Sequence, residues 1–208
     1  MTYVNRGEAG DLLASQLNAY ADRPDVVVLG LVRGGVPVAA RVSTSLRVPL
    51  DVLVVRKLGV PGAPEVAFGA LGPDGVAVHN PAVETYVSEE EADAVSADAA
   101  DEVDRREALY RRGRPRLSLT GRTAIVVDDG LATGATARAA VAVARVRGAA
   151  SVVLAVPVAA PEAVDLLRRE ADEVVCPLVA ADFVSVSSFY NAFPQIDDDE
   201  VIELIDAG

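Results

Sequence analysis

The stretch that decides the fold runs from Thr123 to Thr136 and reads TAIVVDDGLATGAT. Four apolar residues lead directly into Asp128 and Asp129, and a loop of small residues follows. An uninterrupted apolar run of this kind predicts a strand that is buried on both faces. Two adjacent aspartates after a strand can be a plain solvated turn, but the attached ATGAT loop favours a ligand site.

Strands and helices alternate on both sides of this stretch. Apolar and β-branched runs predict buried strands over residues 25–32, 49–57, 123–128, 151–157 and 173–178. Helical patterns occupy residues 8–22, 36–46, 88–112, 135–147 and 161–171. This alternation predicts an α/β fold with a central, mostly parallel sheet, helices on its faces and right-handed crossovers.

Two segments depart from the alternation. Residues 57–75 are rich in Gly and Pro, which predicts a flexible loop with a short strand over 66–71 and a hairpin turn over 73–75. A return strand is expected over residues 76–79. Residues 181–208 hold most of the phenylalanines and an acidic helix. We therefore expect an α/β core over 1–180 and a C-terminal tail over 181–208, in one domain.

Composition excludes several classes of protein. The chain has 208 residues, is 51% hydrophobic and carries a net charge of −12, so it can build a core but repels nucleic acids and anionic membranes. Neither a signal peptide nor an apolar run of membrane-spanning length is present in the sequence, which predicts a cytoplasmic protein. Cys176 is interpreted as a small buried hydrophobe, and His79 as structural or exposed rather than a metal ligand.

Three strand ends carry unusual residues, and ligands of open parallel sheets bind at the carboxyl ends of the strands. Asp128 and Asp129 accept hydrogen bonds from hydroxyls, and the loop after them opens a helix whose amides attract an anion. A sugar phosphate such as ribose 5-phosphate suits both groups. The other two ends, Arg33-Gly34-Gly35 and Arg56-Lys57, are cationic and favour a second anionic group.

One compound with a 5-phosphate, two ribose hydroxyls and a pyrophosphate is phosphoribosyl pyrophosphate. Plainer interpretations stay open: Arg33-Gly34-Gly35 can be a simple helix-start turn, and Arg56-Lys57 a solvent-facing strand end. The loop lacks the lysine of a Walker A motif, and no GxGxxG pattern occurs in the sequence.

TAIVVDDGLATGAT resembles the signature of the type I phosphoribosyltransferases, and GLVRGGVPVA resembles their pyrophosphate loop. VVRKLGVPGAPE stands where their flexible catalytic loop leaves the second core strand. The resemblance covers roughly residues 1–180. The chain is also similar to a bacterial group, assigned to the phosphoribosyltransferases by sequence, that shares the RGGVPVA, VRKLG and VDDGLATGAT segments.

The resemblance implies a role for each group. Asp128 and Asp129 contact the ribose hydroxyls, and Asp129 is also expected to be catalytic. Arg56 and Lys57 are expected to be catalytic because they assist the departing pyrophosphate. The 5-phosphate is held by the loop of Ala132, Thr133, Gly134, Ala135 and Thr136. The pyrophosphate is held by Arg33, Gly34 and Gly35. The resemblance further implies Mg²⁺ bound mainly through the substrate, and a cis peptide bond between Val32 and Arg33.

The acceptor is constrained at one position. Enzymes for 6-oxopurines carry an aspartate where this chain has Ala132, so hypoxanthine and guanine are disfavoured, and the tail does not match the base-binding region of the uracil enzymes. In the family the chain ends build a hood over the base. The hood candidates within 181–195 are Phe183, Phe189, Tyr190 and Phe193, with core or oligomer packing as their plainer interpretation.

Three functions follow from these expectations. The leading one is transfer of a phosphoribosyl group to a nitrogenous acceptor that is not a 6-oxopurine, by a protein that acts alone or as a homodimer. The alternative is a non-catalytic regulator that binds phosphoribosyl pyrophosphate or a nucleotide. A hydrolase that uses the aspartates with Mg²⁺ is a third, against which the Thr-Gly loop and the lack of a metal-ligand cluster in the sequence argue.

Overall fold

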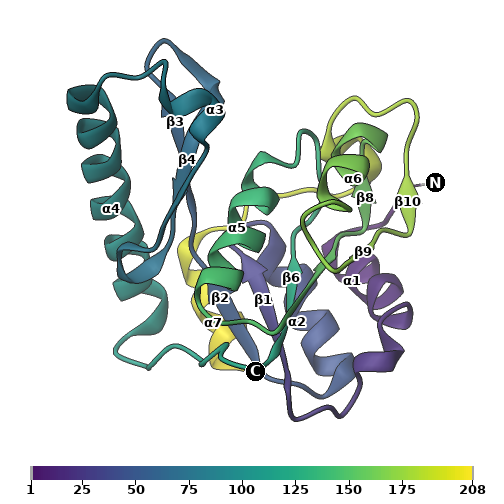
Figure 1. Ribbon diagram of the computed structural model, residues 1–208. Helices are drawn as coiled ribbons and strands as arrows, with labels where there is room; N and C mark the ends of the chain where they lie inside the picture. The colour runs from purple at the N-terminus through teal and green to yellow at the C-terminus, as the bar shows by residue number, and fades with distance from the viewer. Residues whose placement is uncertain (1, 208) are drawn as a thin grey trace.

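The computed structural model describes residues 2–207, except for the side chains of Pro64, Glu65, Pro81 and Glu84. Its centre is a parallel sheet of five strands in the order β2-β1-β6-β7-β9 (Figure 1). The strands are β1 (Val26–Leu31), β2 (Leu50–Leu53), β6 (Thr123–Val127), β7 (Ser151–Ala155) and β9 (Glu173–Val175). Every neighbouring pair is parallel, which confirms the predicted α/β fold.

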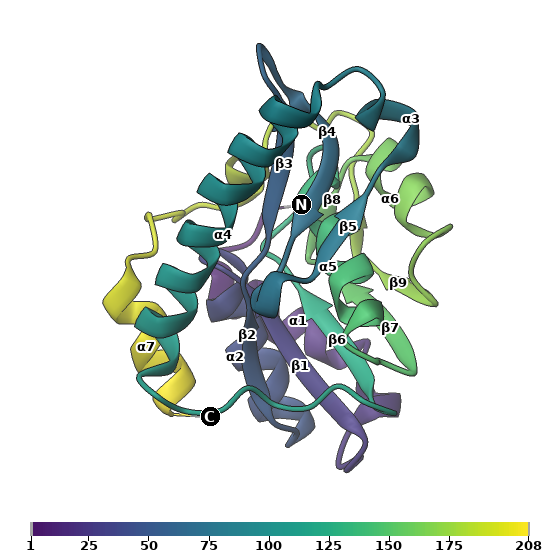
Figure 2. The ribbon, with the colours of Figure 1, turned by 60° about the vertical axis from the view of Figure 1, so that its left-hand side comes forward.

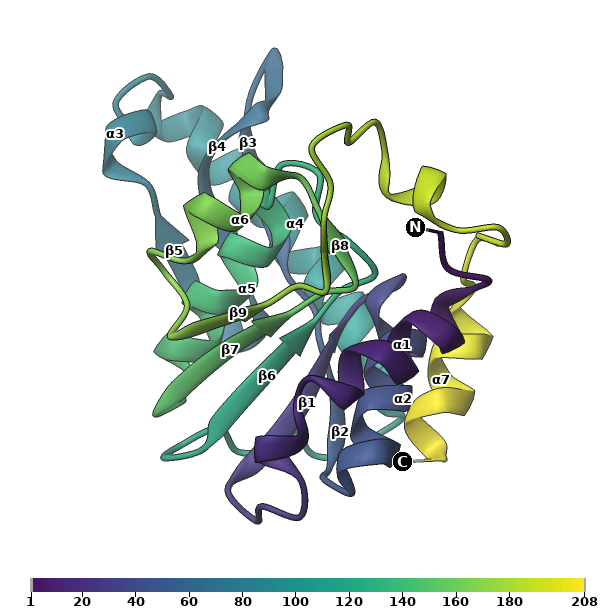
Figure 3. The same cartoon turned by 90° about the vertical axis from the view of Figure 1, so that its right-hand side faces the viewer.

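Helices cover both faces of this sheet because alternate strand residues point to opposite sides. Val26 and Val28 pack with the apolar side chains of α1 (Arg6–Ser15) and α2 (Gly35–Leu46), which lie side by side in Figure 3. Val27 and Leu29 point the other way, into a cluster with α5 (Ala135–Val146) and α6 (Pro161–Leu167). The predicted helix over 8–22 is shorter than expected, since α1 ends at Ser15 and a 3₁₀ turn, η1 (Asn18–Tyr20), follows.

A second, antiparallel sheet stands beside the core and shares no strand with it (Figure 2). It consists of β3 (Arg56–Val60), β4 (Ala63–Leu71) and β5 (Ala77–His79), and the short α3 (Pro81–Glu84) and the long α4 (Glu89–Arg111) follow it in the chain. Leu58 and Phe68 are buried against Ala99 of α4. We call residues 56–111 the flap.

The flap corrects two expectations. The strand expected over 49–57 is divided, because β2 ends at Leu53 and β3 starts a different sheet at Arg56. Much of the loop expected over 57–75 is a strand pair, since its apolar side chains find a partner in α4. The hairpin turn over 73–75 is confirmed as the 3₁₀ turn η2 (Pro73–Gly75), and the flexibility of the segment stays a prediction.

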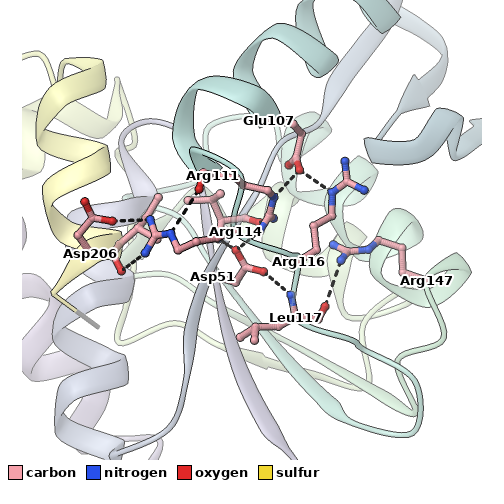
Figure 4. Close-up of polar contacts among 10 residues, drawn as sticks. Asp51, Glu107, Arg111, Arg114, Arg116, Leu117, Arg147 and Asp206 are labelled. Atoms are coloured by element: carbon pink, nitrogen blue, oxygen red, sulfur yellow. Dashed lines mark hydrogen bonds and ion pairs between the residues drawn. The ribbon is translucent and has the colours of Figure 1, made fainter.

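The start of α4 follows the sequence closely. Ser88 is its N-cap and accepts a hydrogen bond from the amide of Glu91, whose carboxylate bonds back to the Ser88 amide. This reciprocal capping box satisfies two amides at the helix start. At its other end, α4 reaches the core through a network of buried charges (Figure 4).

That network joins the flap to the sheet. Arg111 of α4 lies 2.8 Å from Asp51 of β2 and 2.5 Å from Glu107 one turn earlier. The second oxygen of Asp51 accepts from the amide of Leu117, at 2.9 Å, on the segment that returns to the core (Figure 4). Arg116 bridges Glu107 to Asp74 of the hairpin turn. The network therefore holds the C-terminal end of the flap and its hairpin turn close to β2.

The first residues of the chain pair with the C-terminal tail at Tyr190. Tyr3 forms a parallel bridge to Tyr190, and its amide donates to the carbonyl of Phe189 at 2.8 Å. The tail includes the 3₁₀ turn η3 (Val186–Phe189) and the acidic helix α7 (Asp198–Asp206). A two-stranded sheet of β8 (Val158–Ala159) and β10 (Leu178–Val179) lies beside η3, whereas α7 packs on α2 and β2. Among the residues described, no helix has the length and apolar character needed to span a bilayer.

Candidate functional site

The loops after β1 and β6 lie side by side, because Gly30 and Val127 are register partners at the ends of these strands. The expected cis peptide bond between Val32 and Arg33 is confirmed. A side chain at Gly34 would clash with the carboxylate of Asp129, and a Cβ at Gly35 would lie 2.5 Å from the Val127 carbonyl oxygen. The two glycines are thus required for the Arg33 loop to pack against the acidic pair.

A cavity of about 480 Å³ opens at this place. The Arg33 loop and the acidic pair supply one side, and the C-terminal tail supplies the other. Its lining comprises Arg6, Arg33, Gly34, Asp128, Asp129, Val186, Phe193, Pro194, Gln195 and Ile196. The structure therefore brings two of the three predicted strand ends together beneath a wall of tail residues.

The two aspartates occupy unequal environments. Burial raises the pKa of Asp128 well above its usual range, and the neighbouring Asp129 raises it further. Burial also raises the pKa of Asp129, but Arg6 opposes this shift from 2.8 Å. Proton uptake therefore favours Asp128, and the pair can offer a neutral carboxyl group beside a charged one. That combination can both donate to and accept from sugar hydroxyls.

We predict that Asp128→Asn makes the ligand-free protein more stable, and increasingly so as pH rises. A carboxyl group whose folded-state pKa is raised stabilises the fold below its ordinary pKa, and this contribution is lost as pH rises through the raised value. Asparagine does not ionise. The difference in unfolding free energy should grow by about 1.4 kcal/mol per pH unit between the two pKa values. Urea denaturation at several pH values measures it, and a difference that stays flat would contradict the assignment.

The loop after the aspartates carries the predicted phosphate groups. Leu131 holds it in place, donating to the Val158 carbonyl and accepting from the Ala160 amide, each at 2.9 Å. Gly134 caps α5 with φ of +75°, a conformation that favours glycine. The α5 N-terminus suits an anion because its first amides have no partner within the helix. Ala132, Thr133 and Thr136 are exposed around it, and Ala135 is half-buried.

The third predicted strand end lies elsewhere. Arg56 is exposed at the start of β3. Lys57 lines a different cavity, of about 440 Å³, between the flap sheet and α5, where it shares the lining with Thr133 and Arg138. Neither cation lines the cavity of the aspartates. Their role at pyrophosphate stays a prediction and requires the flap to move.

Arg33 has an acidic neighbour that the sequence did not reveal. Its guanidinium lies 3.8 Å from Asp198 at the start of α7. Asp198 also accepts a hydrogen bond of 2.6 Å from the Tyr110 hydroxyl of α4. Arg33 is about one-third exposed, so it can reach a ligand in the cavity while this pair restrains it.

The hood aromatics divide into three roles. Phe183 and Phe189 stack on each other with ring centroids 5.4 Å apart. Tyr190 packs on Tyr3, and its hydroxyl donates to the main-chain oxygen of Asp129 at 2.6 Å. Of the four candidates, Phe193 lines the cavity. Stacking of Phe183, Phe189 or Tyr190 on a base stays a prediction, and Phe193 is the aromatic side chain best placed for it.

Sequence reasoning missed Arg6. Its Nε and one terminal nitrogen lie 2.9 and 2.8 Å from the same oxygen of Asp129, and its other terminal nitrogen donates to the Pro194 carbonyl at 2.7 Å. The guanidinium also lies 3.7 Å from the Phe193 ring centroid. Nothing in its local sequence signals this position, because 123 residues separate it from Asp129.

Comparison with known proteins agrees with this arrangement. The family model described as "Phosphoribosyl transferase domain" matches residues 5–191. A Mycobacterium tuberculosis protein, present in strains H37Rv and CDC 1551 and provisionally named a phosphoribosyl transferase, is 52% identical over 206 residues. That match covers 98% of this chain, which spans 46% of the length of the relative.

Two solved structures are similar. The protein TT1426 from Thermus thermophilus is 42% identical with a TM-score of 0.91, and the match covers 99% of this chain and 98% of that one. The purine phosphoribosyltransferase of Pyrococcus horikoshii Ot3, at 20% identity and a TM-score of 0.51, shares the fold over 95% of this chain and 99% of its own. On the family match and the mycobacterial relative, this chain belongs to the phosphoribosyl transferase domain family.

Proposed function

We propose that the protein transfers the 5-phosphoribosyl group of phosphoribosyl pyrophosphate to a nitrogenous acceptor and releases pyrophosphate. One observation carries the proposal: Asp128 and Asp129 share a cavity with Arg33 and Gly34, and their loop leads directly into the start of α5. Hydroxyl acceptors and a cation thus line one cavity, and the loop that leaves it ends at an anion-binding helix start, where Thr133 and Ala135 line the neighbouring cavity. The family match supports the same chemistry.

The proposed mechanism assigns one task to each group. The amides at the start of α5, with the Thr133 and Thr136 hydroxyls, hold the 5-phosphate. The carboxyl groups of Asp128 and Asp129 orient the ribose hydroxyls. Positive charge develops on the ribose as the bond at C1 breaks, and Arg33 stabilises the negative charge that gathers on the leaving pyrophosphate.

Mg²⁺ suits the oxygen donors of this site. Bound phosphoribosyl pyrophosphate would bring the hard oxygen ligands that Mg²⁺ prefers into the cavity. Among the described residues, no group of three or more acidic, His or Cys side chains is placed to hold a metal ion, so the substrate and water would supply further oxygens. When bound, the ion would neutralise part of the pyrophosphate charge.

The acceptor site is assigned to the wall of the cavity. Phe193, Pro194 and Ile196 form an apolar surface that suits a planar heterocycle, and Gln195 offers hydrogen bonds. Ala132 on the phosphate loop has no carboxylate for a 6-oxopurine. The acceptor is therefore proposed to be a nitrogenous ring or amine other than hypoxanthine or guanine.

A non-catalytic sensor of phosphoribosyl pyrophosphate is the second candidate. The position of Arg56 and Lys57 favours it, because neither cation lines the cavity of the aspartates in this conformation. A protein that only binds the compound needs no cations to assist a leaving group.

The test incubates the protein with phosphoribosyl pyrophosphate, Mg²⁺ and a panel of bases and amines, and measures pyrophosphate release. We expect release that depends on one acceptor. Calorimetry with phosphoribosyl pyrophosphate alone accompanies the assay. Tight binding with no release for any acceptor supports the sensor, and absence of binding contradicts both candidates.

A further inference from the structure

We propose that Arg6 is a positioning residue that orients Asp129 for the ribose and ties it to the acceptor wall, thereby coupling the binding of the two substrates. This proposal rests on the proposed function and deepens it. Its basis is geometric, because one buried guanidinium touches both halves of the cavity. Arg6 is 7% exposed, although it lies at the start of α1.

The contact to Asp129 leaves one carboxylate oxygen for a ligand. Nε and a terminal nitrogen of Arg6 both approach Oδ2, at 2.9 and 2.8 Å. Both of these contacts fall on the same oxygen, so Oδ1 is the one assigned to a sugar hydroxyl. A charge-assisted bond to Oδ2 restricts rotation of the carboxylate and favours its ionised form.

The contact to the acceptor wall uses the rest of the same group. The other terminal nitrogen donates to the Pro194 carbonyl at 2.7 Å, and the guanidinium lies against the Phe193 ring at 3.7 Å. A cation held over an aromatic ring fixes the position of both. Movement of Phe193 or Pro194 on acceptor binding would therefore act on Asp129 through Arg6.

The main chain supports this link. Tyr190 donates to the main-chain oxygen of Asp129, and Asn191 and Ala192 are bonded to the carbonyls of Tyr3 and Val4, just before Arg6. Removing the guanidinium therefore leaves the backbone pairing intact. The charged and titratable groups facing Asp129 are Arg6 from α1, Asp128 from its own loop, Arg33 from the β1 loop and Tyr190 from the tail.

The experiment compares Arg6→Met and Arg6→Lys with the unmodified protein. Met keeps an apolar side chain beside Phe193 without the charge. Lys keeps the charge but has a single nitrogen in place of the three nitrogens of the guanidinium. The matched control is Arg41→Met, which removes an exposed arginine paired with Asp11 of α1. Dissociation constants for phosphoribosyl pyrophosphate are measured by calorimetry from pH 5 to 9, alone and with the acceptor found by the panel.

We expect Arg6→Met to weaken binding of phosphoribosyl pyrophosphate by about 10-fold or more at neutral pH, the usual effect of losing a charged hydrogen bond. The pH midpoint of binding should rise, and Arg6→Lys should recover part of both effects. Any change that the acceptor causes in phosphoribosyl pyrophosphate affinity should shrink in Arg6→Met. Affinity and pH midpoint equal to those of Arg41→Met would overturn the proposal.

A ligand-free measurement separates this proposal from the proposed function. Carbon-13 NMR of the Asp129 carboxyl group gives its titration midpoint in each variant. A midpoint that rises in Arg6→Met and stays in place in Arg41→Met supports the orienting role even if phosphoribosyl pyrophosphate does not bind. An unchanged midpoint overturns that role, whatever the outcome of the activity assay.

Discussion

Replacing Asp128 and Asp129 together with asparagine should reduce pyrophosphate release by about 10³-fold or more, the scale of losing preorganised electrostatic groups at a reacting centre. Both carboxyl groups line the cavity, and Asp129 forms the ion pair with Arg6. Asparagine keeps their size and still offers an oxygen to the Asp129 amide, which now lies 2.9 Å from the Asp128 carboxylate. Turnover should therefore fall while the fold survives.

The control removes the same charge from elsewhere. Asp101 and Asp104 are exposed on α4 and do not line the cavity of the aspartates, so their double asparagine variant should keep full turnover. Initial rates of pyrophosphate release and circular dichroism are compared for the two double variants. Equal rates would exclude the acidic pair from the chemistry.

The largest effect on stability is expected for Arg111→Met. Arg111 is 8% exposed and contacts Asp51 and Glu107, which are 4% exposed each (Figure 4). Its loss leaves two buried carboxylates with too few partners, a change that costs about 3–5 kcal/mol. One oxygen of Glu107 already has no hydrogen-bond partner, so the network has little capacity to compensate.

Arg105→Met is the matched control on the same helix. Arg105 is 56% exposed and pairs with Glu102 at 2.8 Å, so solvent screens the pair and its removal should cost far less than the removal of Arg111. Urea denaturation gives both unfolding free energies. If Arg111→Met is no less stable than Arg105→Met, the buried network does not anchor the flap.

The part of the site that was predictable lies within short stretches of chain. Asp128, Asp129, Thr133 and Gly134 belong to one strand-loop-helix unit, so their order in sequence is already their order in space. Local sequence carries such features because few long-range contacts decide them.

The remaining parts depend on contacts between distant segments. Arg6 reaches Asp129 across 123 residues, and the choice of Phe193 over Phe183 as cavity lining follows from how the tail packs on Tyr3. The Gly- and Pro-rich flap segment was expected to be a loop because the helix on which its strands pack, α4, lies much later in the chain. Composition alone does not show which apolar surfaces meet.

The flap sheet shares no strand with the core sheet, and the C-terminal end of the flap is held to β2 through Arg111 and Asp51. Backbone amides of β3, β4 and β5 therefore can be exposed to solvent without breaking any hydrogen bond of the parallel sheet. Proteins exchange amide protons in such cooperative units. Deuterium uptake should accordingly reveal two classes of protected amides, and the slower class should belong to β1, β6 and β7.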